Sequence, residues 1–528
     1  MERNISAIIS EGKTFIGIEF GSTRIKSVLI DDAFNVLASG NFDWENKLEG
    51  GYWTYGKDEI IEGMQISYRN LAADVYEKYG IKLIKTAAIG ISGMMHGYLA
   101  FDSEDNLLVP FRTWRNITTG VAAKKLSETL SFNIPKRWSI SHLYQAILDK
   151  EPHVDKIDHI NTLAGHIHYL LTGKKVVGIG EASGIFPLSG NGYNKEMLKK
   201  TEELFLASGY SLKLEKLLPS VKKTGETAGY LTERGAKLLD PTGTLQHGIP
   251  LCPPEGDAST GIVATNSIRP GTGNISAGTS IFATVVMKSL LPINNPEIDI
   301  MSTPDGYPTA VIHCGNCTGD IDAWMHIFQE VLKATGSSIE KSKLFETLMN
   351  KAMEADADLG GLMNFNYISG ESITGIKPGV PLFLRQPGAR FTLANFLQTH
   401  LFSALATLRI GMEYFFKEGV KFNRIICHGG FFHSQAGAKA MAAALDSPVY
   451  LYKTASLGGP WGMALLAAYS QSEESLTLAD YLDNKVFKNF ELIQVLPDRD
   501  TVTSFVSFLE KYRKFLKVEA DASRCFNE

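Results

Sequence analysis

Cysteine is scarce in this chain, and its number is odd. Only 5 of the 528 residues are cysteine. So few cysteines do not make a disulfide framework, and an odd count argues against an exported chain in which every cysteine is paired. The opening residues, MERNISAIISEGK, contain too short an apolar stretch for a signal peptide. We therefore expect a protein of the reducing cytoplasm.

The chain also lacks a strong charge of one sign and long hydrophobic runs. It has 52 Lys and Arg against 57 Asp and Glu, a formal net charge of −5. This small acidic excess gives no electrostatic reason to bind nucleic acid or an anionic membrane. No apolar run approaches the ~18–20 residues of a membrane span. We therefore expect neither nucleic acid nor membrane as a partner.

Two common nucleotide-binding motifs are missing as well. The chain contains no G-x-x-x-x-G-K-[ST] sequence, which excludes a P-loop. The stretch GIGEASG (178–184) misses the glycine spacing of a dinucleotide-binding turn by one residue. Any nucleotide site must therefore be of another kind.

Length and periodicity predict an α/β protein of two domains. Single cores stop growing at roughly 250–300 residues, so 528 residues need two. Apolar spacing predicts helices at 58–80, 162–173 and 399–419, each ending at glycine, between segments of strand character. Glycine and proline are dense around 240–275, which is our candidate junction. We expect domains at 1–258 and 259–528.

Two similar bends lie about half the chain length apart, in FIGIEFGSTRIKSVLID (15–31) and NISAGTSIFATVV (274–286). Each joins two apolar strands through glycine and hydroxyl residues. Exposed N–H groups and small hydroxyls donate hydrogen bonds to phosphate, and glycine lets the backbone come close. Arg24 and Lys26 share one strand face and could add positive charge. The alternative is a pair of structural hairpins with solvated charges.

Polar residues near the predicted junction suit a hydroxyl substrate. Asp257, in PPEGDAST, could act as a general base, although an acid beside glycine is often only a turn or helix cap. His96, in SGMMHG, offers the neutral donors and acceptors that a polyhydroxyl ligand needs. Trp114, in PFRTWRN, offers a flat face for sugar C–H groups. The alternative for both is ordinary core.

Three further stretches contain paired glycines or paired cysteines. HGGFFHS (428–434) and LGGPWGMALLAAY (457–469) place glycines at the start of a predicted helix, where a base or ribose could lie, or where the chain only turns. HCGNC contains Cys314 and Cys317. A structural zinc site needs four ligands and a redox pair needs a thioredoxin-like context, so we do not expect either use.

Seven segments, taken in order, resemble the FGGY carbohydrate kinases of the actin, Hsp70 and hexokinase-like superfamily, and most closely their xylulokinase-like members. They are IGIEFGSTRIKSVLID, AIGISGMMHGYLAFD, LTGKKVVGIGEASGIFPL, EGDASTGIVATNSIRPGTGNISAGTSIFATV, NYISGE, ICHGGFFHSQAGAKAMAAALDSPVYL and LGGPWGMALLAAY. They span most of the chain at sensible spacing. The resemblance implies two actin/hexokinase-like (ribonuclease H-like) domains around a deep interdomain cleft.

The resemblance also implies a role for each matching residue, in an ATP- and Mg2+-dependent kinase of a ketopentose or related ketose or polyol. Asp257 would be the catalytic base and Glu19 would face the magnesium ion. The sugar would be lined by Met95, His96, Trp114 and Asn116. Phosphates and adenosine would be held by Gly21, Ser22, Thr23, Lys26, Gly278, Thr279, Ser280, Gly429, Gly430, Phe431 and Ser434. A homodimer is left open.

The chain departs from the family pattern at several of these positions. Glu19 replaces the usual Asp, Met94 the usual Gln, Asn116 an acid, and Glu181 the Asp of D-A-S-G, while Glu255 stands where glycine is common. These changes leave a second hypothesis open: a regulator that binds sugar or nucleotide and has lost turnover. An Hsp70- or actin-like ATPase without a sugar is disfavoured by SGMMHG.

Overall fold

The structure is a computed structural model and describes residues 4–291, 296–453 and 458–527. It divides into two compact units. The first comprises the described parts of Met1–Arg269, Ser289–Thr309 and Leu457–Asn489, and the second those of Pro270–Lys288, Ala310–Ser456 and Phe490–Glu528. Both are α/β, which confirms the predicted fold class; the boundary between residues 258 and 259 stays a prediction.

A mixed sheet forms the centre of the first unit. Its strands run in the order β13-β14-β6-β1-β2-β3, and β15 pairs with β6 beyond β14. Their bounds are β1 Thr14–Phe20, β2 Arg24–Asp31, β3 Val36–Asp43, β6 Ala88–Gly93, β13 Gly229–Tyr230, β14 Pro250–Leu251 and β15 Glu255–Gly256. β1, β6 and β15 are parallel, whereas β1 and β2 form the predicted antiparallel hairpin.

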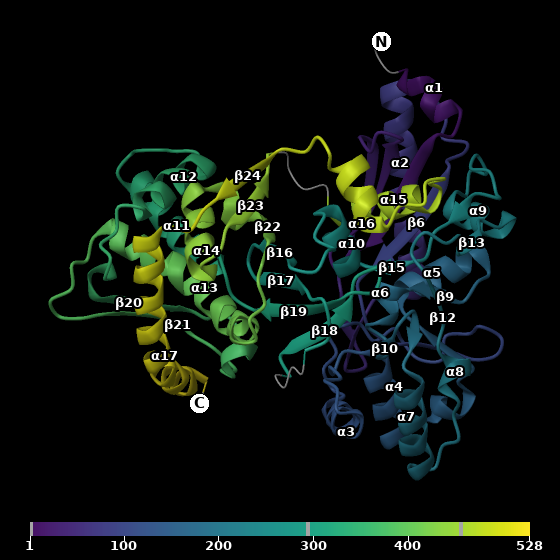
Figure 1. Cartoon of the computed structure of the whole chain (residues 1–528), viewed down its shortest axis with the longest axis horizontal. Coiled ribbons are helices and arrows are strands. Elements are labelled where there is room, and N and C mark those ends of the chain that lie inside the picture. Colours follow the sequence, from purple (N-terminus) through teal and green to yellow (C-terminus); the bar gives the residue numbers. More distant parts are fainter. Residues whose placement is uncertain (1–3, 292–295, 454–457, 528) are drawn as a thin grey trace. The chain divides into compact units, whose positions relative to one another are not determined.

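Helices cover both faces of this sheet (Figure 1). α2 (Lys57–Tyr79) packs on β2 and β3, where the Cα of Gly40 approaches Leu71. On the opposite face α15 (Gly458–Ser470) packs on β1 and β6 together with α10 (Asp257–Ala264), and the Cα of Gly17 approaches Pro460. Leu457, the first residue of the predicted glycine helix, lies outside the described residues.

The remaining elements of the first unit surround this core. Its other helices are α1 Ile5–Ser10, α3 Gly120–Leu130, α4 Ser139–Leu148, η1 Pro152–Lys156, α5 Leu163–Thr172, α6 Ile179–Ala182, α7 Lys195–Ala207, α8 Leu214–Leu217, α9 Glu233–Leu239, α16 Leu478–Tyr481 and η5 Leu482–Val486. Its other strands are β4 Lys47–Glu49, β5 Tyr52–Thr54, β7 Leu99–Phe101, β8 His159–Asn161, β9 Val176–Gly178, β10 Leu188–Ser189, β11 Gly192–Tyr193, β12 Ser220–Lys222 and β18 Ile298–Ser302.

The second unit repeats the plan of strand, bend and strand followed by helices. Its strands run in the order β19-β17-β16-β22-β23-β24. They are β16 Thr272–Ala277, β17 Ile281–Val286, β19 Pro308–Cys314, β22 Arg424–His428, β23 Val449–Tyr452 and β24 Leu492–Val495. β16 pairs antiparallel with β17 and parallel with β22, as β1 does with β2 and β6.

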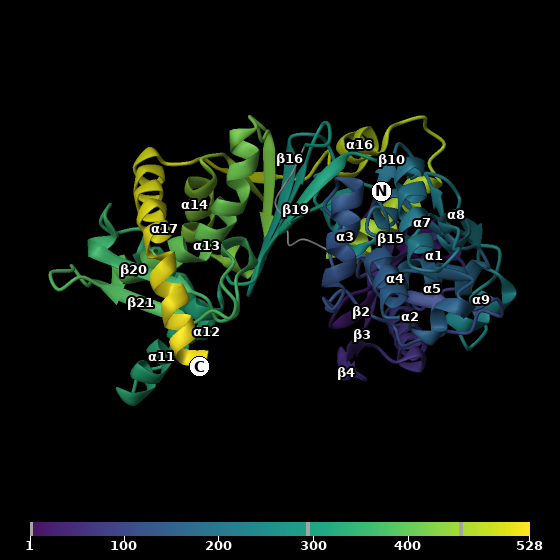
Figure 2. The same cartoon turned by 90° about the horizontal axis from the view of Figure 1, so that it is seen from below.

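A helical layer accompanies this second sheet. It includes α11 Gly319–Ala334, α12 Lys341–Ala352, η2 Leu359–Gly361, η3 Ser372–Thr374, α13 Leu393–Lys417, η4 Gly430–His433, α14 Gln435–Leu445 and α17 Arg499–Asn527, with the hairpin β20 Leu362–Asn366 and β21 Pro381–Arg385. α17 packs against α13 and α14 (Figure 2). Among the helices of the described ranges, none is long and apolar enough to cross a membrane.

Candidate active site

The carboxyl ends of three parallel strands meet at one edge of the first sheet. Glu19 of β1 and Glu255 of β15 both lie opposite Ser92 of β6 in the strand register. Asp257 follows β15 directly and is the first residue of α10. In open α/β sheets, ligands bind outside the carboxyl ends of the strands. This edge is therefore the candidate site of the first unit.

The first bend, Gly21 to Thr23, is held by two aromatic side chains. Trp44 Nε1 donates to the Gly21 carbonyl (2.7 Å), Tyr55 Oη to the Ser22 carbonyl (2.5 Å), and the Trp44 backbone N–H to the Thr23 carbonyl (3.2 Å). The two rings stack with centroids 4.1 Å apart. All three carbonyls are thus tied to one aromatic pair, which fixes the conformation of the bend.

Trp44 and Tyr55 were not identified from the sequence. The only signal is the aromatic-rich stretch WENKLEGGYWTY (44–55), directly after β3. Aromatic residues at that spacing fit a core equally well, so their link to the bend depends on tertiary contacts that no local pattern shows.

Glu19 is a buried carboxyl at the end of β1, with 8% of its surface exposed. Burial and the nearby charge of Asp257 raise the pKa of Glu19 to about 7, while Lys26 acts in the opposite direction. Lys26 is the residue opposite Glu19 in the β1–β2 pairing. Arg24, its neighbour on the same strand face, forms an ion pair with Asp43.

Asp257 is held by backbone groups. Its Oδ1 accepts hydrogen bonds from the N–H of Ala258 (2.9 Å) and of Met95 (3.3 Å). Burial raises the pKa of Asp257 to about 6, although these backbone donors lower it. The result is a carboxylate with a fixed orientation whose proton affinity is close to that needed for proton transfer near neutral pH.

Two more buried carboxyls lie beside Asp257. Glu255 accepts hydrogen bonds from the N–H groups of Glu181 (2.8 Å) and Gly180 (3.3 Å). Burial raises the pKa of Glu255 to about 8 and that of Glu181 well above its ordinary range. Burial therefore favours the protonated form of both side chains. In the sequence they stand out only as departures from the family pattern.

Met95 and His96 lie next to Asp257. Met95 packs on Gly256, where a Cβ atom would overlap its side chain. His96 has a positive φ of 68°, rare for a non-glycine residue, and its Nδ1 lies 3.2 Å from the Gly184 carbonyl. Burial, together with Arg137, lowers the pKa of His96 to about 3. The ring is therefore neutral: Nδ1–H donates to Gly184, and Nε2 is left as an acceptor.

Trp114 and Asn116 lie near the first bend but differ in solvent exposure. Trp114 is 36% exposed, and its Nε1 donates to the Ser22 hydroxyl (3.3 Å). Asn116 is buried, and its amide both donates to and accepts from the backbone of Trp53 at 2.8 Å. Its Nδ2 also donates to the Thr113 carbonyl. Asn116 therefore fixes the loop that carries Trp114.

The second bend, Gly278 to Ser280, lies in the second unit between β16 and β17. Its carbonyls accept from the loop between β19 and α11: Cys317 N–H donates to Thr279 (2.9 Å) and Thr318 N–H to Gly278 (3.0 Å). A Cβ atom added to Gly278 would meet nothing within 4 Å. The bend is supported from one side and open at Gly278, as phosphate approach requires.

The glycine turn after β22 lies beside this second bend. His428 pairs with Ser276, one residue before the end of β16. Gly429 has a φ of 104°, and a Cβ atom there would overlap the Ala277 carbonyl, so glycine is required. Gly430 is open, Phe431 is buried, and Ser434 caps α14 by accepting from Gly437 N–H.

The residues described fit a cation held mainly by water and phosphate. In the described ranges, no group of three or more His, Cys, Asp and Glu side chains is arranged to hold a metal. Mg2+ keeps several waters and needs only one or two carboxylates. Glu19 and Asp257 are such a pair, and their mutual repulsion would be relieved by a cation. Cys314 and Cys317 are buried, and burial raises the pKa of both thiols.

Comparisons with known proteins agree with this arrangement. Residues 14–264 match the N-terminal domain, and residues 273–471 the C-terminal domain, of the FGGY family of carbohydrate kinases. The chain is 22% identical to the xylulose kinase of Haemophilus influenzae over 525 residues, covering 94% of this chain and 98% of that protein.

Solved structures share the fold. The ligand-bound xylulose kinase of Lactobacillus acidophilus superimposes with a TM-score of 0.79 at 16% identity, and the gluconate kinase of the same organism with 0.78 at 16%. Each alignment covers 97% of this chain and 99% of the other. Because kinases of different acceptors share this fold, the fold alone does not identify the acceptor.

Proposed function

Because the chain belongs to the FGGY family of carbohydrate kinases, and is therefore an ATP-dependent sugar kinase, we propose that its acceptor is a ketopentose or a related ketose or polyol. The observation that carries this proposal is the half-buried Asp257, oriented by the N–H of Met95, which the neutral His96 follows in the chain. The xylulose kinase from Haemophilus influenzae, matched over nearly its full length, supports a ketopentose.

Asp257 is assigned as the general base. Its Oδ1 is occupied by two backbone N–H donors, so we assign Oδ2 to the sugar hydroxyl. Removing the hydroxyl proton as the phosphoryl group arrives is the chemical step that a side chain can assist. The raised pKa of Asp257 supports this role, because it makes the carboxylate a stronger base than an exposed Asp.

Met95, His96 and Trp114 are assigned to the sugar. The neutral His96 ring can accept from a hydroxyl through Nε2, and the partly exposed Trp114 offers its face to C–H groups. Met95 fixes one wall by packing on Gly256. Asn116, whose amide is occupied by backbone groups, contributes by positioning Trp114.

The two bends and the glycine turn are assigned to ATP. Gly21, Ser22, Thr23 and Lys26 in the first unit would bind phosphate oxygens. In the second unit, the corresponding residues are Gly278, Thr279, Ser280, Gly429, Gly430, Phe431 and Ser434. Glu19 would hold Mg2+ through water. When bound, the metal ion neutralises charge on the transferring phosphate. The protein supplies alignment and the base.

The alternative is a binding protein of the same fold with weakened turnover, suggested by the departures at Glu19, Met94 and Glu255. An ADP-release assay over ketoses, aldoses, polyols and gluconate separates the two. Turnover highest with a ketopentose supports the proposal. Turnover highest with gluconate would assign another acceptor, and sugar binding without any ADP release would favour the regulator.

A further inference from the structure

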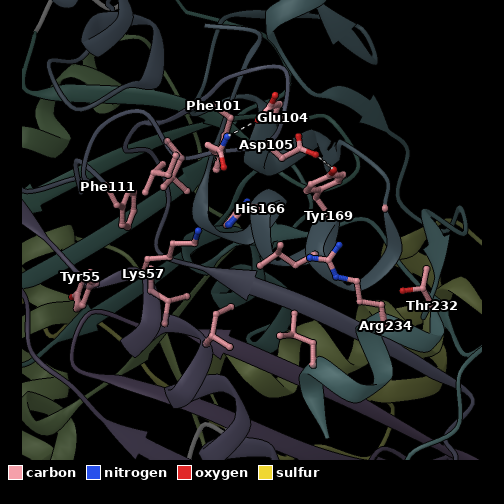
Figure 3. Close-up of a pocket in the computed structure, with 18 residues that line it drawn as sticks. Tyr55, Lys57, Phe101, Glu104, Asp105, Phe111, His166, Tyr169, Thr232 and Arg234 are labelled. Atoms are coloured by element: carbon pink, nitrogen blue, oxygen red, sulfur yellow. Dashed lines mark hydrogen bonds between the residues drawn. The ribbon is translucent and has the colours of Figure 1, made fainter. Parts of the chain in front are cut away.

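A pocket lies in the first unit, and none of the residues assigned to sugar and ATP lines it. Its volume is about 610 Å³, within the range of small-molecule sites. It is bounded by α2, α5, α9, β7 and the loop that carries Glu104 and Asp105 (Figure 3). Its lining is rich in aliphatic and aromatic side chains, among them Ile60, Phe101, Phe111, Leu170 and Leu238.

Two cations line this pocket without a carboxylate partner. Lys57 begins α2, and Arg234 lies in the first turn of α9. Within the part of the chain that the structure describes, neither forms an ion pair, whereas the neighbouring Lys237 pairs with Glu233. In Figure 3 the two cations approach the pocket from opposite sides of His166. The positive charge at this pocket is therefore not neutralised by local pairing.

The acidic residues of the pocket do not cancel this charge. Asp105 pairs with Lys175 at 2.9 Å and accepts from the Tyr169 hydroxyl, so its charge is already balanced. Glu104 lies beside it on the same loop, away from Lys57 and Arg234 in Figure 3. His166 adds no charge, because burial lowers its pKa to about 4. The positive charges of Lys57 and Arg234 are therefore not balanced by the carboxylates that line the pocket.

We propose that this pocket binds a small organic anion with an apolar body, and that the ligand acts on the ATP site through Tyr55. The apolar lining would bury the body of the ligand, and Lys57 and Arg234 would bind its anionic group. An uncharged ligand would leave both cations unpaired, and a sugar would leave the apolar lining without a partner. None of the residues assigned to sugar or ATP lines the pocket.

Tyr55 connects the pocket to the first bend. Its side chain lines the pocket, while its hydroxyl donates to the Ser22 carbonyl at 2.5 Å and its ring stacks on Trp44. Trp44 in turn donates to the Gly21 carbonyl. A ligand that packs against Tyr55 therefore acts on the same contacts that shape the phosphate-binding bend.

Binding is tested with 8-anilinonaphthalene-1-sulfonate, an apolar anion of suitable size, by fluorescence with saturating ATP and Mg2+ so that the ATP site is filled. We expect saturable binding that weakens about tenfold or more in the double variant Lys57→Gln/Arg234→Gln, equivalent to the loss of a charged contact. Lys237→Gln is the matched control. Lys237 lies on α9 with Arg234 but is already paired with Glu233, so its replacement should leave the affinity for the sulfonate unchanged.

Binding of the uncharged N-phenyl-1-naphthylamine measures the apolar contacts of the pocket without the charged contact. Its affinity should not change in Lys57→Gln/Arg234→Gln. Binding of both dyes should be lost in Leu170→Trp, because the larger side chain fills the pocket. The charge variants alter exposed residues, so they test the proposal even if Leu170→Trp does not fold. Sulfonate binding that survives both charge substitutions, or that ATP displaces completely, would overturn it.

Coupling is tested on the KM for ATP. We expect the bound sulfonate to change this KM at least threefold in the wild-type chain and to have almost no effect in Tyr55→Phe, which keeps the ring but lacks the hydroxyl. A bound dye that leaves the KM unchanged would refute the coupling. This readout needs kinase activity, whereas fluorescence does not, so failure of the proposed acceptor is distinguishable from failure of the pocket.

Discussion

The carboxylate of Glu19 lies directly on the backbone of Gly459, at the start of α15. A Cβ atom on Gly459 would overlap Oε2 of Glu19. Glutamate is one methylene longer than the aspartate usual in the family, and here the extra length brings the carboxylate to the first turn of the helix. Negative charge is favourable at a helix N-terminus, which opposes the burial and the charge of Asp257 that raise the pKa of Glu19.

Gly459→Ala should displace Glu19. The added methyl group forces the carboxylate away, and overpacking of this kind costs about 1–3 kcal/mol of stability. We expect a lower urea midpoint and a higher Mg2+ concentration for half-maximal activity. Gly192→Ala is the control, because its Cβ would meet nothing within 4 Å. Equal Mg2+ dependence in both variants would contradict the role of this contact.

Glu19→Asp should keep or improve Mg2+-dependent activity, because the charge is retained and the shorter side chain restores the family residue. Glu19→Gln has the length of glutamate without its charge and should lose activity strongly, by about 100-fold if one charged contact is lost. Activity is measured by ADP release across a Mg2+ titration. Complete loss in Glu19→Asp would show that the reach to Gly459 is required.

Asp257→Asn should abolish phosphoryl transfer while sparing sugar binding. Loss of a general base typically costs about 10²–10⁴-fold in rate. The amide keeps the size of the carboxylate, so the packing of the side chains around Met95 should persist. ADP release measures the rate, and calorimetry with the preferred sugar measures binding. Normal turnover in this variant would remove Asp257 from the role of base.

The pH dependence of kcat/KM provides a separate test of Asp257. Its pKa is raised to about 6, and only the ionised form accepts a proton. We expect kcat/KM to rise with pH and level off above about 6, with a slope near tenfold per pH unit on the acid side. Sugar binding by the Asp257→Asn variant over the same range is the control. A flat profile between pH 5 and 7 would exclude this assignment.

Local patterns predicted several of the helices and both bends. The helix expected at 58–80 is α2, ending before Gly80 in the left-handed conformation, and that expected at 162–173 is α5, ending before Gly173 in the same way. These glycines terminate their helices by backbone geometry alone, which sequence shows directly. The helix expected to begin at 399 instead begins at Leu393, because the Thr392 side chain caps it by accepting from the N–H of Asn395.

The parts of the site that sequence did not predict depend on contacts between distant residues. Tyr55 is 33 positions from Ser22, and Glu255 is 74 from Glu181, yet each pair shares a hydrogen bond. An aromatic or acidic residue carries no local signal of such a partner. Motif residues could be found because their spacing within one bend is itself the signal; their supporting residues could not.

Glu181 provides a prediction about stability rather than rate. Burial, above all, raises its pKa well above the ordinary value of 4.5. In the unfolded chain Glu181 ionises near pH 4.5, whereas in the folded protein it keeps its proton to a much higher pH. Folding therefore takes up a proton. The stability that this group contributes is complete below pH 4.5 and is lost as the pH rises toward the folded pKa.

Glu181→Gln should therefore make the melting temperature less dependent on pH between 5 and 8. Glutamine resembles the protonated acid and cannot ionise, so the variant avoids the cost of keeping Glu181 neutral as the pH rises. The decline of the melting temperature with rising pH should become shallower in this variant. It should not vanish, because the raised pKa of Glu255 acts in the same direction. Glu203→Gln, at an exposed position on α7, is the matched control. If Glu181→Gln and the wild-type chain declined with the same slope, Glu181 would not be held protonated in the folded protein.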